Sequence, residues 1–260
     1  MDNQSRQSLG NGFDEVGHGY AAHRPGYPVD VAAWLVGDNP SDVLDLAAGS
    51  GQLTTQLATI GHRVVAAELS GSMLAELRQD LPVLAVVQSH AEQLPIRSGA
   101  FDVVTVATAF HWFDASRALP EIARVLRPGG RLGLVWNTRE TNSDWARALD
   151  KLLRSAQPAG LTGDWGTDSV KQVFESPLFD EPEYVEFHHT QALSHDGLVG
   201  LVASRSYVIA MPANQRDRLL GQVSDLYDET TGSSYPFELA YRSQCWRTTC
   251  AGPKGKLRRC

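Results

Sequence analysis

The sequence predicts an α/β protein with a doubly wound, mostly parallel seven-stranded sheet and a helical insertion in its C-terminal half. Three observations indicate this fold. Segments of strand and helix character alternate from residue 42 onward, which is typical of right-handed βαβ crossovers. The expected strands are near-continuous runs of Val, Leu and Ala, as in a parallel sheet buried on both faces. Residues 43–53, V-L-D-L-A-A-G-S-G-Q-L, join an apolar strand through a small-residue loop to a segment with helical spacing.

Each element follows from apolar periodicity and from start and stop signals. Strands are expected at 42–46, 63–67, 83–87, 102–107, 131–136, 184–189 and 237–247. Helices are expected at 29–36, 52–60, 72–79, 116–126, 144–154, 170–174 and 216–227. The turn R-P-G-G at 127–130 should end one helix and lead into the fifth strand, because Pro cannot continue a helix and Gly accepts positive φ.

A length of 260 residues suits one α/β domain with additions. We expect a single domain over 13–250, with a core at about 41–137 and a lid with the last strands at about 138–250. Residues 1–12 are expected to be a mobile lead. Residues 251–260, which are basic, are expected to be a disordered tail.

The composition indicates where the protein is located in the cell and which kinds of partner it binds. No apolar run approaches the roughly 18 residues of a membrane helix, and residues 1–11 lack the apolar stretch of a secretory signal. A cytoplasmic protein without membrane contact is therefore expected. The net charge is −7, and the last ten residues carry four basic groups and no acid, so the rest of the chain carries −11. This charge disfavours a nucleic-acid substrate.

Cysteine usage argues against two kinds of site. All three cysteines, Cys245, Cys250 and Cys260, lie near the C-terminus without C-x-x-C spacing. That pattern fits neither a disulfide framework nor a zinc site. The histidines form no ligand cluster either, so no metal is expected.

The loop after the first strand carries Gly49 and Gly51, which allow a ligand to approach the backbone next to a helix N-terminus. A dinucleotide site would need a third glycine where Thr54 stands. A Tyr-x-x-x-Lys pair and a phosphate loop are also absent from the sequence. Glu68 ends the second strand, where a carboxylate can accept both hydroxyls of a ribose. These features suit an adenosine cofactor.

Five motifs in this order resemble a class I S-adenosylmethionine-dependent methyltransferase of the small-molecule, UbiE-like group. They are D-L-A-A-G-S-G-Q-L, A-E-L-S-G-S-M-L, A-E-Q-L-P, F-D-V-V and L-R-P-G-G-R-L. The segments Y-A-A-H-R-P-G-Y-P, A-F-H-W-F-D and V-W-N-T-R resemble the trans-aconitate methyltransferase-like branch. The resemblance implies a Rossmann-like methyltransferase fold and S-adenosyl-L-methionine as the cofactor.

The resemblance also implies roles for individual residues. Asp45 and the loop Ala47, Ala48, Gly49 and Gly51 would face the methionine end of the cofactor. Glu68 would bind the ribose, Leu69 and Met73 the adenine, and His90 and Ala91 the adenine edge. Thr108 and Ala109 would lie near the sulfonium, and Tyr20 and Arg24 would close over the amino-acid end.

Two positions depart from the family pattern. Ala47 stands where the family usually has its first glycine, so an ordinary φ is expected there. His90 stands where an Asp commonly meets the adenine amino group, and a neutral imidazole nitrogen could still accept that hydrogen bond.

The acceptor side is less defined. His111 is the candidate general base, because the loop after the fourth strand lies at the carboxyl edge of the sheet; His111 and Trp112 could equally form only the pocket wall. Asn137 and Arg139 leave the fifth strand at the same edge and could bind an acidic acceptor. Arg205 and Tyr207 lie in the apolar insertion expected to cover the site, where Arg205 needs a substrate group or an internal acid as its partner.

The sequence therefore predicts a methyltransferase that acts on a small molecule, a carboxylic acid or a phenol or other hydroxyl of a metabolite. Two alternatives stay open at this point: an NAD(P)-dependent oxidoreductase, and a non-catalytic cofactor-binding protein on the same fold. The protein is expected to be a monomer or a homodimer.

Overall fold

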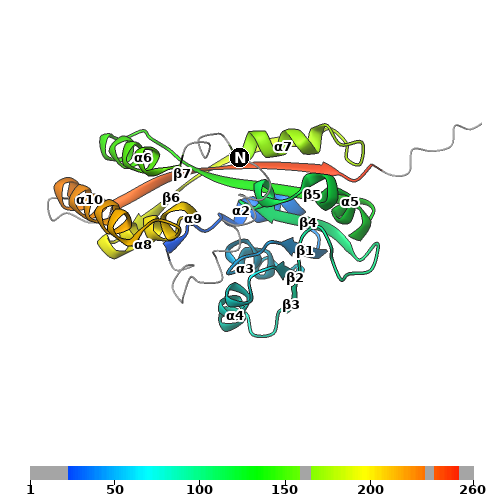
Figure 1. The fold of residues 1–260 in the computed structure, drawn as a ribbon. Coiled ribbons are helices and arrows are strands. Elements are labelled where there is room, and N and C mark those ends of the chain that lie inside the picture. Colours follow the sequence, from blue (N-terminus) through cyan, green and yellow to red (C-terminus); the bar gives the residue numbers. More distant parts are fainter. Residues whose placement is uncertain (1–22, 159–164, 232–236, 252–260) are drawn as a thin grey trace, which may run out of the picture. The chain divides into compact units, whose positions relative to one another are not determined.

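The computed structural model describes residues 23–158, 165–231 and 237–251. It contains one sheet with the strands β1 (Asp42–Leu46), β2 (Arg63–Glu68), β3 (Ala85–Gln88), β4 (Phe101–Ala107), β5 (Leu126–Arg139), β6 (Glu183–Leu193) and β7 (Phe237–Thr249). Their order is β3-β2-β1-β4-β5-β7-β6 (Figure 1). Strands β1 to β5 pair in parallel. The predicted seven-stranded, mostly parallel α/β fold is confirmed.

The helices of the described residues are α2 (Val29–Val36), α3 (Gln52–Thr59), α4 (Gly71–Asp80), α5 (Ala115–Val125), α6 (Asp144–Ala156), α7 (Trp165–Phe174), α8 (His195–Ala203), α9 (Ser206–Ile209) and α10 (Ala213–Thr231). Side-chain caps define several of their starts: Ser70 accepts a hydrogen bond from Met73 N–H, and Asp114 accepts one from Ser116 N–H. Such caps satisfy N–H groups that the helix leaves unpaired. The predicted helix ends at 52–60, 72–79 and 116–126 agree with the structure to within one residue.

Successive side chains of a strand point to opposite sides of the sheet. In the parallel strands, both sets of side chains are buried, because an apolar core lies on each side. On β1, Val43 belongs to the hydrophobic core formed with α2 and α3. Its neighbour Leu44 belongs to the core formed with α5 and α7. Val103 and Val104 of β4 divide in the same way. Asp45 and Thr105 therefore point to the α3 side of the sheet, which brings them into the cofactor region described below.

Strand β5 differs from its prediction at both ends. It begins at Leu126, directly after α5, and extends to Arg139 instead of stopping at residue 136. Phe101 pairs with Leu126, whereas Val103 pairs with Arg131, so the R-P-G-G segment is an irregularity inside the strand and no separate turn. A Cβ at Gly130 would lie 2.9 Å from the carbonyl of Arg127 and 3.0 Å from that of Asp102, which explains the glycine.

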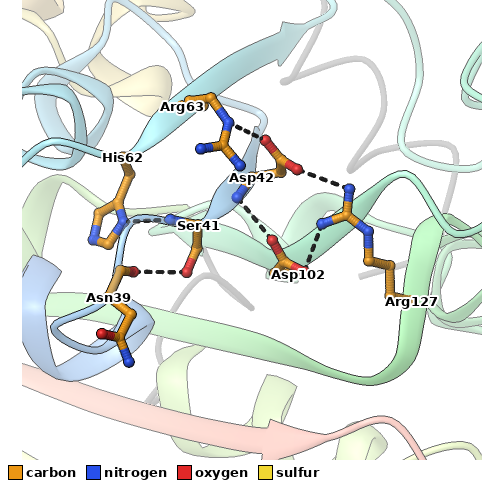
Figure 2. A network of polar contacts seen from close by, with 7 residues as sticks. All are labelled: Asn39, Ser41, Asp42, His62, Arg63, Asp102 and Arg127. Atoms are coloured by element: carbon orange, nitrogen blue, oxygen red, sulfur yellow. Dashed lines mark hydrogen bonds and ion pairs between the residues drawn. The ribbon is translucent and has the colours of Figure 1, made fainter.

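An ion-pair network fixes the amino ends of β1, β2 and β4 to this irregularity (Figure 2). Arg127 binds Asp42 at 2.7 Å and Asp102 at 2.5 Å, and Arg63 binds Asp42 at 2.6 Å. The backbone N–H of Asp42 donates to the Asp102 carboxylate at 2.9 Å. Hydrogen bonds from Arg63 and then Arg127 lower the pKa of Asp42 to about 2. The network gives the polar R-P-G-G segment a defined position.

Contacts divide the chain into two compact units. Among the described residues, the sheet unit comprises 27–136, 165–187 and 243–251, and the helical unit comprises 23–26, 137–158, 188–231 and 237–242. Strands β5, β6 and β7 contribute residues to both units. The expectation of a single domain over 13–250 stays a prediction. The 1–12 lead lies outside the described residues, as does the tail apart from Ala251. No helix within the described ranges is long and apolar enough to cross a membrane.

Candidate functional site

The loop from β1 to α3 carries the glycines that the sequence singles out. The Ala48 N–H donates to the carbonyl of Ala67 on β2 at 3.1 Å, and the Gly51 N–H donates to the Ala48 carbonyl at 3.0 Å. Gly51 has a φ of 93° and directly precedes α3. A Cβ there would lie 3.1 Å from the Leu77 side chain. Both the backbone conformation and the close packing therefore require glycine at Gly51.

The expectation of an ordinary φ at Ala47 is wrong. Ala47 has a φ of 56°, in the left-handed region. An alanine in this region costs roughly 1–2 kcal/mol because its Cβ crowds the following carbonyl. Position 47 therefore keeps the backbone conformation that a glycine would supply, and the hydrogen bonds of the neighbouring loop hold it there.

Ala47→Gly should consequently stabilise the protein. Relief of the left-handed strain exceeds the extra unfolded-state entropy of glycine, so we expect a gain of about 0.5–1 kcal/mol in the free energy of unfolding. Urea titration measures it, with Ala58→Gly, inside α3, as a control that should lose roughly 1 kcal/mol. A loss of stability in Ala47→Gly would contradict the assigned conformation.

Glu68 joins two loops at the carboxyl edge of the sheet. Its Oε2 accepts a hydrogen bond from Gly49 N–H at 2.8 Å, and its Oε1 accepts from the N–H groups of Leu69 at 2.8 Å and Ser70 at 2.9 Å. The side chain is buried, with 9% exposure. Charge-assisted hydrogen bonds of this kind hold a buried carboxylate in place. Glu68 thus connects the glycine loop to the start of α4.

Asp45 lies one residue before the end of β1 and is 1% exposed. It accepts hydrogen bonds from the hydroxyls of Thr54 on α3 at 2.5 Å and Thr105 on β4 at 2.9 Å. Burial, helped by the nearby Glu68 charge, raises the pKa of Asp45 to about 6, although the hydrogen bonds from the two hydroxyls act in the opposite direction. The result is a buried acid that titrates near neutrality, a property often found at functional sites.

The residues predicted around the adenine gather near this edge. Met73 lies beside the glycine loop, since a Cβ at Gly49 would be 3.8 Å from its Sδ. Leu69 exposes 37% of its surface, whereas Ala91 is buried. The segment that leads to His90 is anchored by a hydrogen bond from Ser89 N–H to the Glu68 carbonyl at 3.1 Å. The His90 side chain is exposed.

Thr108 and Ala109 follow β4 at the same edge. Thr108 has a φ of 51°, its N–H donates to the Val135 carbonyl at 2.7 Å, and its hydroxyl shares a hydrogen bond with the Tyr27 hydroxyl at 2.9 Å. Ala109 is buried. The strained backbone at Thr108 lies where strain commonly accompanies function.

His111 contacts two indole rings. Its Nδ1 accepts a hydrogen bond from Trp136 Nε1 at 3.3 Å, and its ring centroid lies 4.7 Å from that of Trp112. An indole N–H can only donate, so Nδ1 is unprotonated in this arrangement and neutral His111 carries its proton on Nε2. The predicted pair His111 and Trp112 is therefore brought together, and Trp136 of the V-W-N-T-R segment joins it as a third member.

The remaining predicted residues belong to the helical unit. Arg24 donates to the Ser204 carbonyl at 2.7 Å. Arg139 pairs with Asp150 at 3.3 Å, and Asn137 Oδ1 meets His189 Nε2 at 3.4 Å. The Arg205 guanidinium lies 6.0 Å from the Tyr207 ring centroid.

Among the described residues, no acid serves as the internal partner predicted for Arg205. The buried Nε of Arg205 has no hydrogen-bond partner there. Tyr20 lies outside the described residues. A cavity of about 560 Å³ at the amino ends of the strands, lined in part by Asp42, Arg63 and Arg127, includes none of the predicted site residues.

Two threonines orient Asp45, and the sequence patterns predict neither as a site residue. Thr54 stands where a dinucleotide site would have its third glycine, and Thr105 belongs to an apolar strand. A usable signal for Thr54 was its position on the first turn of the helix that follows an acid-ended strand. Thr105 sits 60 residues from Asp45, and no local pattern connects the two.

Comparison with known proteins places the chain in a family. A family model described as a methyltransferase domain matches residues 44–134. An uncharacterized methyltransferase of Mycobacterium tuberculosis is 39% identical over 249 residues, which cover 95% of this chain and 99% of the relative. The chain belongs to this methyltransferase family. The oxidoreductase alternative is accordingly not favoured.

Two further comparisons are more limited: one relative matches only part of this methyltransferase, and one solved structure is similar in fold. A demethylmenaquinone methyltransferase of Mycolicibacterium vanbaalenii is 42% identical over 124 residues, 46% of this chain and 53% of the relative. A solved structure from Anaeromyxobacter dehalogenans, provisionally assigned as a type II methyltransferase, has a TM-score of 0.65 at 24% identity. It covers 86% of this chain and 97% of its own, and it supports the fold.

Proposed function

We propose that this methyltransferase transfers the methyl group of S-adenosyl-L-methionine to a small-molecule acceptor, a carboxylic acid or a phenol or other hydroxyl. One observation supports the cofactor above others. Two buried carboxylates lie near the carboxyl ends of adjacent parallel strands, Asp45 one residue before the end of β1 and Glu68 at the end of β2. An acid at each of these positions suits a ligand with a cationic amino-acid end and a ribose diol. We further propose the narrower UbiE-like assignment, for which the partial demethylmenaquinone methyltransferase match is the support.

The residues of this edge fit such a cofactor. A carboxylate has about four acceptor positions, and three on Glu68 are used by backbone N–H groups. A ribose diol needs two positions, so its binding must displace one backbone donor. The bond from Gly49 is the one that connects to the glycine loop. We infer that cofactor binding replaces the Gly49 bond and leaves the Leu69 and Ser70 bonds in place.

The bound cofactor would supply a methyl carbon already activated by an adjacent sulfonium. A carboxylate acceptor would lose no proton on methylation, whereas a phenol or other hydroxyl would have to release its proton to a base. The protein's main contribution is alignment, which can be worth roughly 7–11 kcal/mol. Asp45, Glu68 and the glycine loop would hold one partner, and the loop with Thr108 and His111 would lie near the reacting atoms.

His111 is proposed as a wall and hydrogen-bond donor and not as the base. Its Nδ1 accepts a hydrogen bond from the Trp136 N–H. Uptake of a proton at Nδ1 would break this bond, because an indole N–H cannot accept a hydrogen bond in return. We therefore expect His111→Gln, which can keep a bond to Trp136, to lower kcat by less than tenfold. Loss of a true general base typically costs roughly 10²- to 10⁴-fold. Single-turnover rates with an established acceptor separate the two outcomes, and Trp112→Phe serves as the control for a change in pocket shape.

Calorimetry with S-adenosylhomocysteine tests the cofactor assignment. Binding at tens of micromolar or tighter is expected, and no binding would refute the proposal. Titration with NADH should give no signal. Turnover of a panel of acids and phenols distinguishes an enzyme from a non-catalytic cofactor-binding protein. A cytoplasmic location, a monomeric or homodimeric state and the absence of nucleic-acid contact stay predictions.

A further inference from the structure

Two residues of the described chain hold a left-handed backbone without being glycine. Ala47 has a φ of 56° and Thr108 a φ of 51°. The conformation is more costly for Thr108, because its side chain branches at Cβ and crowds the backbone more than a methyl group does. Strained backbone of this kind persists only where surrounding contacts impose it, and it clusters at functional sites. Thr108 therefore raises two questions: which contacts hold it, and what its conformation serves.

Both residues stand where the winding of the sheet reverses. Strands β1 and β4 are adjacent and parallel, with Asp45 of β1 opposite Thr105 of β4. The helix after β1, α3, packs on one face of the sheet, and the helix after β4, α5, packs on the other face. Ligands of open α/β sheets bind in the crevice that such a reversal leaves at the carboxyl ends of the strands. Ala47 directly follows β1 and Thr108 directly follows β4, so the two strained residues border this crevice.

Two hydrogen bonds hold Thr108 in its conformation. Its backbone N–H donates to the Val135 carbonyl at 2.7 Å, next to the pair that Ala107 forms with Val135 in the β4–β5 ladder. Its hydroxyl shares a hydrogen bond at 2.9 Å with the hydroxyl of Tyr27, which lies 81 residues earlier in the sequence. The first bond belongs to the pairing of the strands. The second comes from outside the sheet and restrains the side chain at the edge of the crevice.

Tyr27 is a rigid anchor for this second bond. It directly precedes Pro28, which has a φ of −55° and begins α2, and the proline ring fixes that angle. The Tyr27 side chain is 8% exposed and belongs to the hydrophobic core that includes Val31 and Leu35 of α2. Close packing of the ring in this core gives its hydroxyl a defined position. Tyr27 can therefore restrain Thr108 although it lies outside the strands.

We propose that Tyr27 is a positioning residue of this methyltransferase: its hydroxyl holds Thr108 in the left-handed conformation in which the cofactor is bound. The proposal rests on the proposed function, because it takes the bound ligand to be S-adenosyl-L-methionine. The net stabilisation by one hydrogen bond and the strain of one left-handed residue are similar in size. Loss of the Tyr27 bond therefore lets Thr108 relax toward a negative φ. Only the fraction of molecules that stays left-handed is then competent to bind, which lowers the apparent affinity.

Tyr27→Phe tests the proposal by calorimetry with S-adenosylhomocysteine. The substitution keeps the buried ring and removes the hydroxyl. We expect the dissociation constant to rise about three- to tenfold, the change that one neutral hydrogen bond makes in an equilibrium. Tyr184→Phe is the matched control, because it also removes a tyrosine hydroxyl that accepts a hydrogen bond, in this case from Gln244 Nε2 at 3.3 Å. The control should leave the affinity unchanged.

Two substitutions of Thr108 separate its backbone conformation from its hydroxyl. Thr108→Val and Thr108→Gly both remove the bond to Tyr27, but valine keeps the branched Cβ that disfavours positive φ, whereas glycine adopts positive φ freely. Thr108→Val should match Tyr27→Phe, and the double variant should be no weaker than either single variant. Thr108→Gly should bind at least about threefold more tightly than Thr108→Val. Equal affinities of the valine and glycine variants would show that the left-handed conformation is not what binding requires, and would overturn the proposal.

Thermal unfolding of the same variants separates positioning from folding. A hydroxyl that serves only the fold would lower the unfolding midpoint of Tyr27→Phe and leave its affinity for S-adenosylhomocysteine as in wild type. That result would overturn the proposal while the cofactor assignment stands. Failure of the wild type to bind S-adenosylhomocysteine would instead refute the proposed function, and this proposal with it. A weaker affinity in Tyr27→Phe and not in Tyr184→Phe supports the positioning role.

Discussion

Replacing Glu68 by glutamine is expected to weaken S-adenosylhomocysteine binding by at least about 100-fold. The amide removes the charge from the hydrogen bonds proposed to the ribose hydroxyls, and each such bond to a charged group is worth roughly 1.5–3 kcal/mol. Its NH₂ group would also face one of the three backbone donors that now point at the carboxylate. We therefore expect the free energy of unfolding to fall by about 1–3 kcal/mol as well.

Calorimetry and urea denaturation measure these two effects separately. Asp80→Asn, an exposed acid at the end of α4, is the matched control and should change neither quantity. If Glu68→Gln lowers stability but leaves the affinity within tenfold of wild type, Glu68 holds the loops together and does not bind the cofactor. If neither quantity changes, the geometry assigned to Glu68 is itself wrong.

Asp45→Asn should alter the pH dependence of stability. The pKa of Asp45 rises from 3.8 to about 6 on folding, so the folded state binds this proton more tightly than the unfolded state. Between about pH 4 and pH 6 the wild type then loses stability as the pH rises. A shift of this size is worth about 3 kcal/mol, and the full cost is present above pH 6. The free energy of unfolding of Asp45→Asn minus that of wild type should therefore be about 3 kcal/mol larger at pH 8 than at pH 4.

The same substitution tests whether Asp45 meets a cation. A bound ammonium group favours the ionised carboxylate, so cofactor affinity should fall about tenfold for each pH unit below about pH 6. Asp45→Asn should bind more weakly at pH 8 and should lose this dependence. Asp80→Asn again provides the control for general effects of charge. An identical pH profile of affinity in wild type and Asp45→Asn would exclude contact between Asp45 and the cationic end of the cofactor.

Local sequence was sufficient for the elements and for much of the cofactor edge. Strands β1 and β4 were predictable because residues buried on both faces must be apolar in succession. Gly51 was predictable from the small-residue loop between a strand and a helix, and its positive φ and the close approach of Leu77 explain why the residue is glycine. Glu68 and Asp45 were predictable as acids near the carboxyl ends of apolar strands, because a buried acid needs polar partners and therefore stands out in such a strand.

Contacts between distant residues decided the rest. The left-handed φ of Ala47 follows from the closure of the loop onto β2, whereas its side chain favours ordinary φ values. Thr105 reaches Asp45 across 60 residues of sequence, and Trp136 reaches His111 across 25. Such partners are chosen by strand order and register, which apolar periodicity does not encode residue by residue.

The sequence by itself determined an α/β fold, a glycine loop between two acid-ended strands and a methyltransferase resemblance. These features are predictable because burial pattern and backbone conformation depend on residues that are close together in the sequence. Only the tertiary structure decided that Thr54 and Thr105 orient Asp45 and that Trp136 selects the tautomer of His111. Those pairings depend on how separate strands and helices meet, and a hydrogen bond between them leaves no local pattern in the chain.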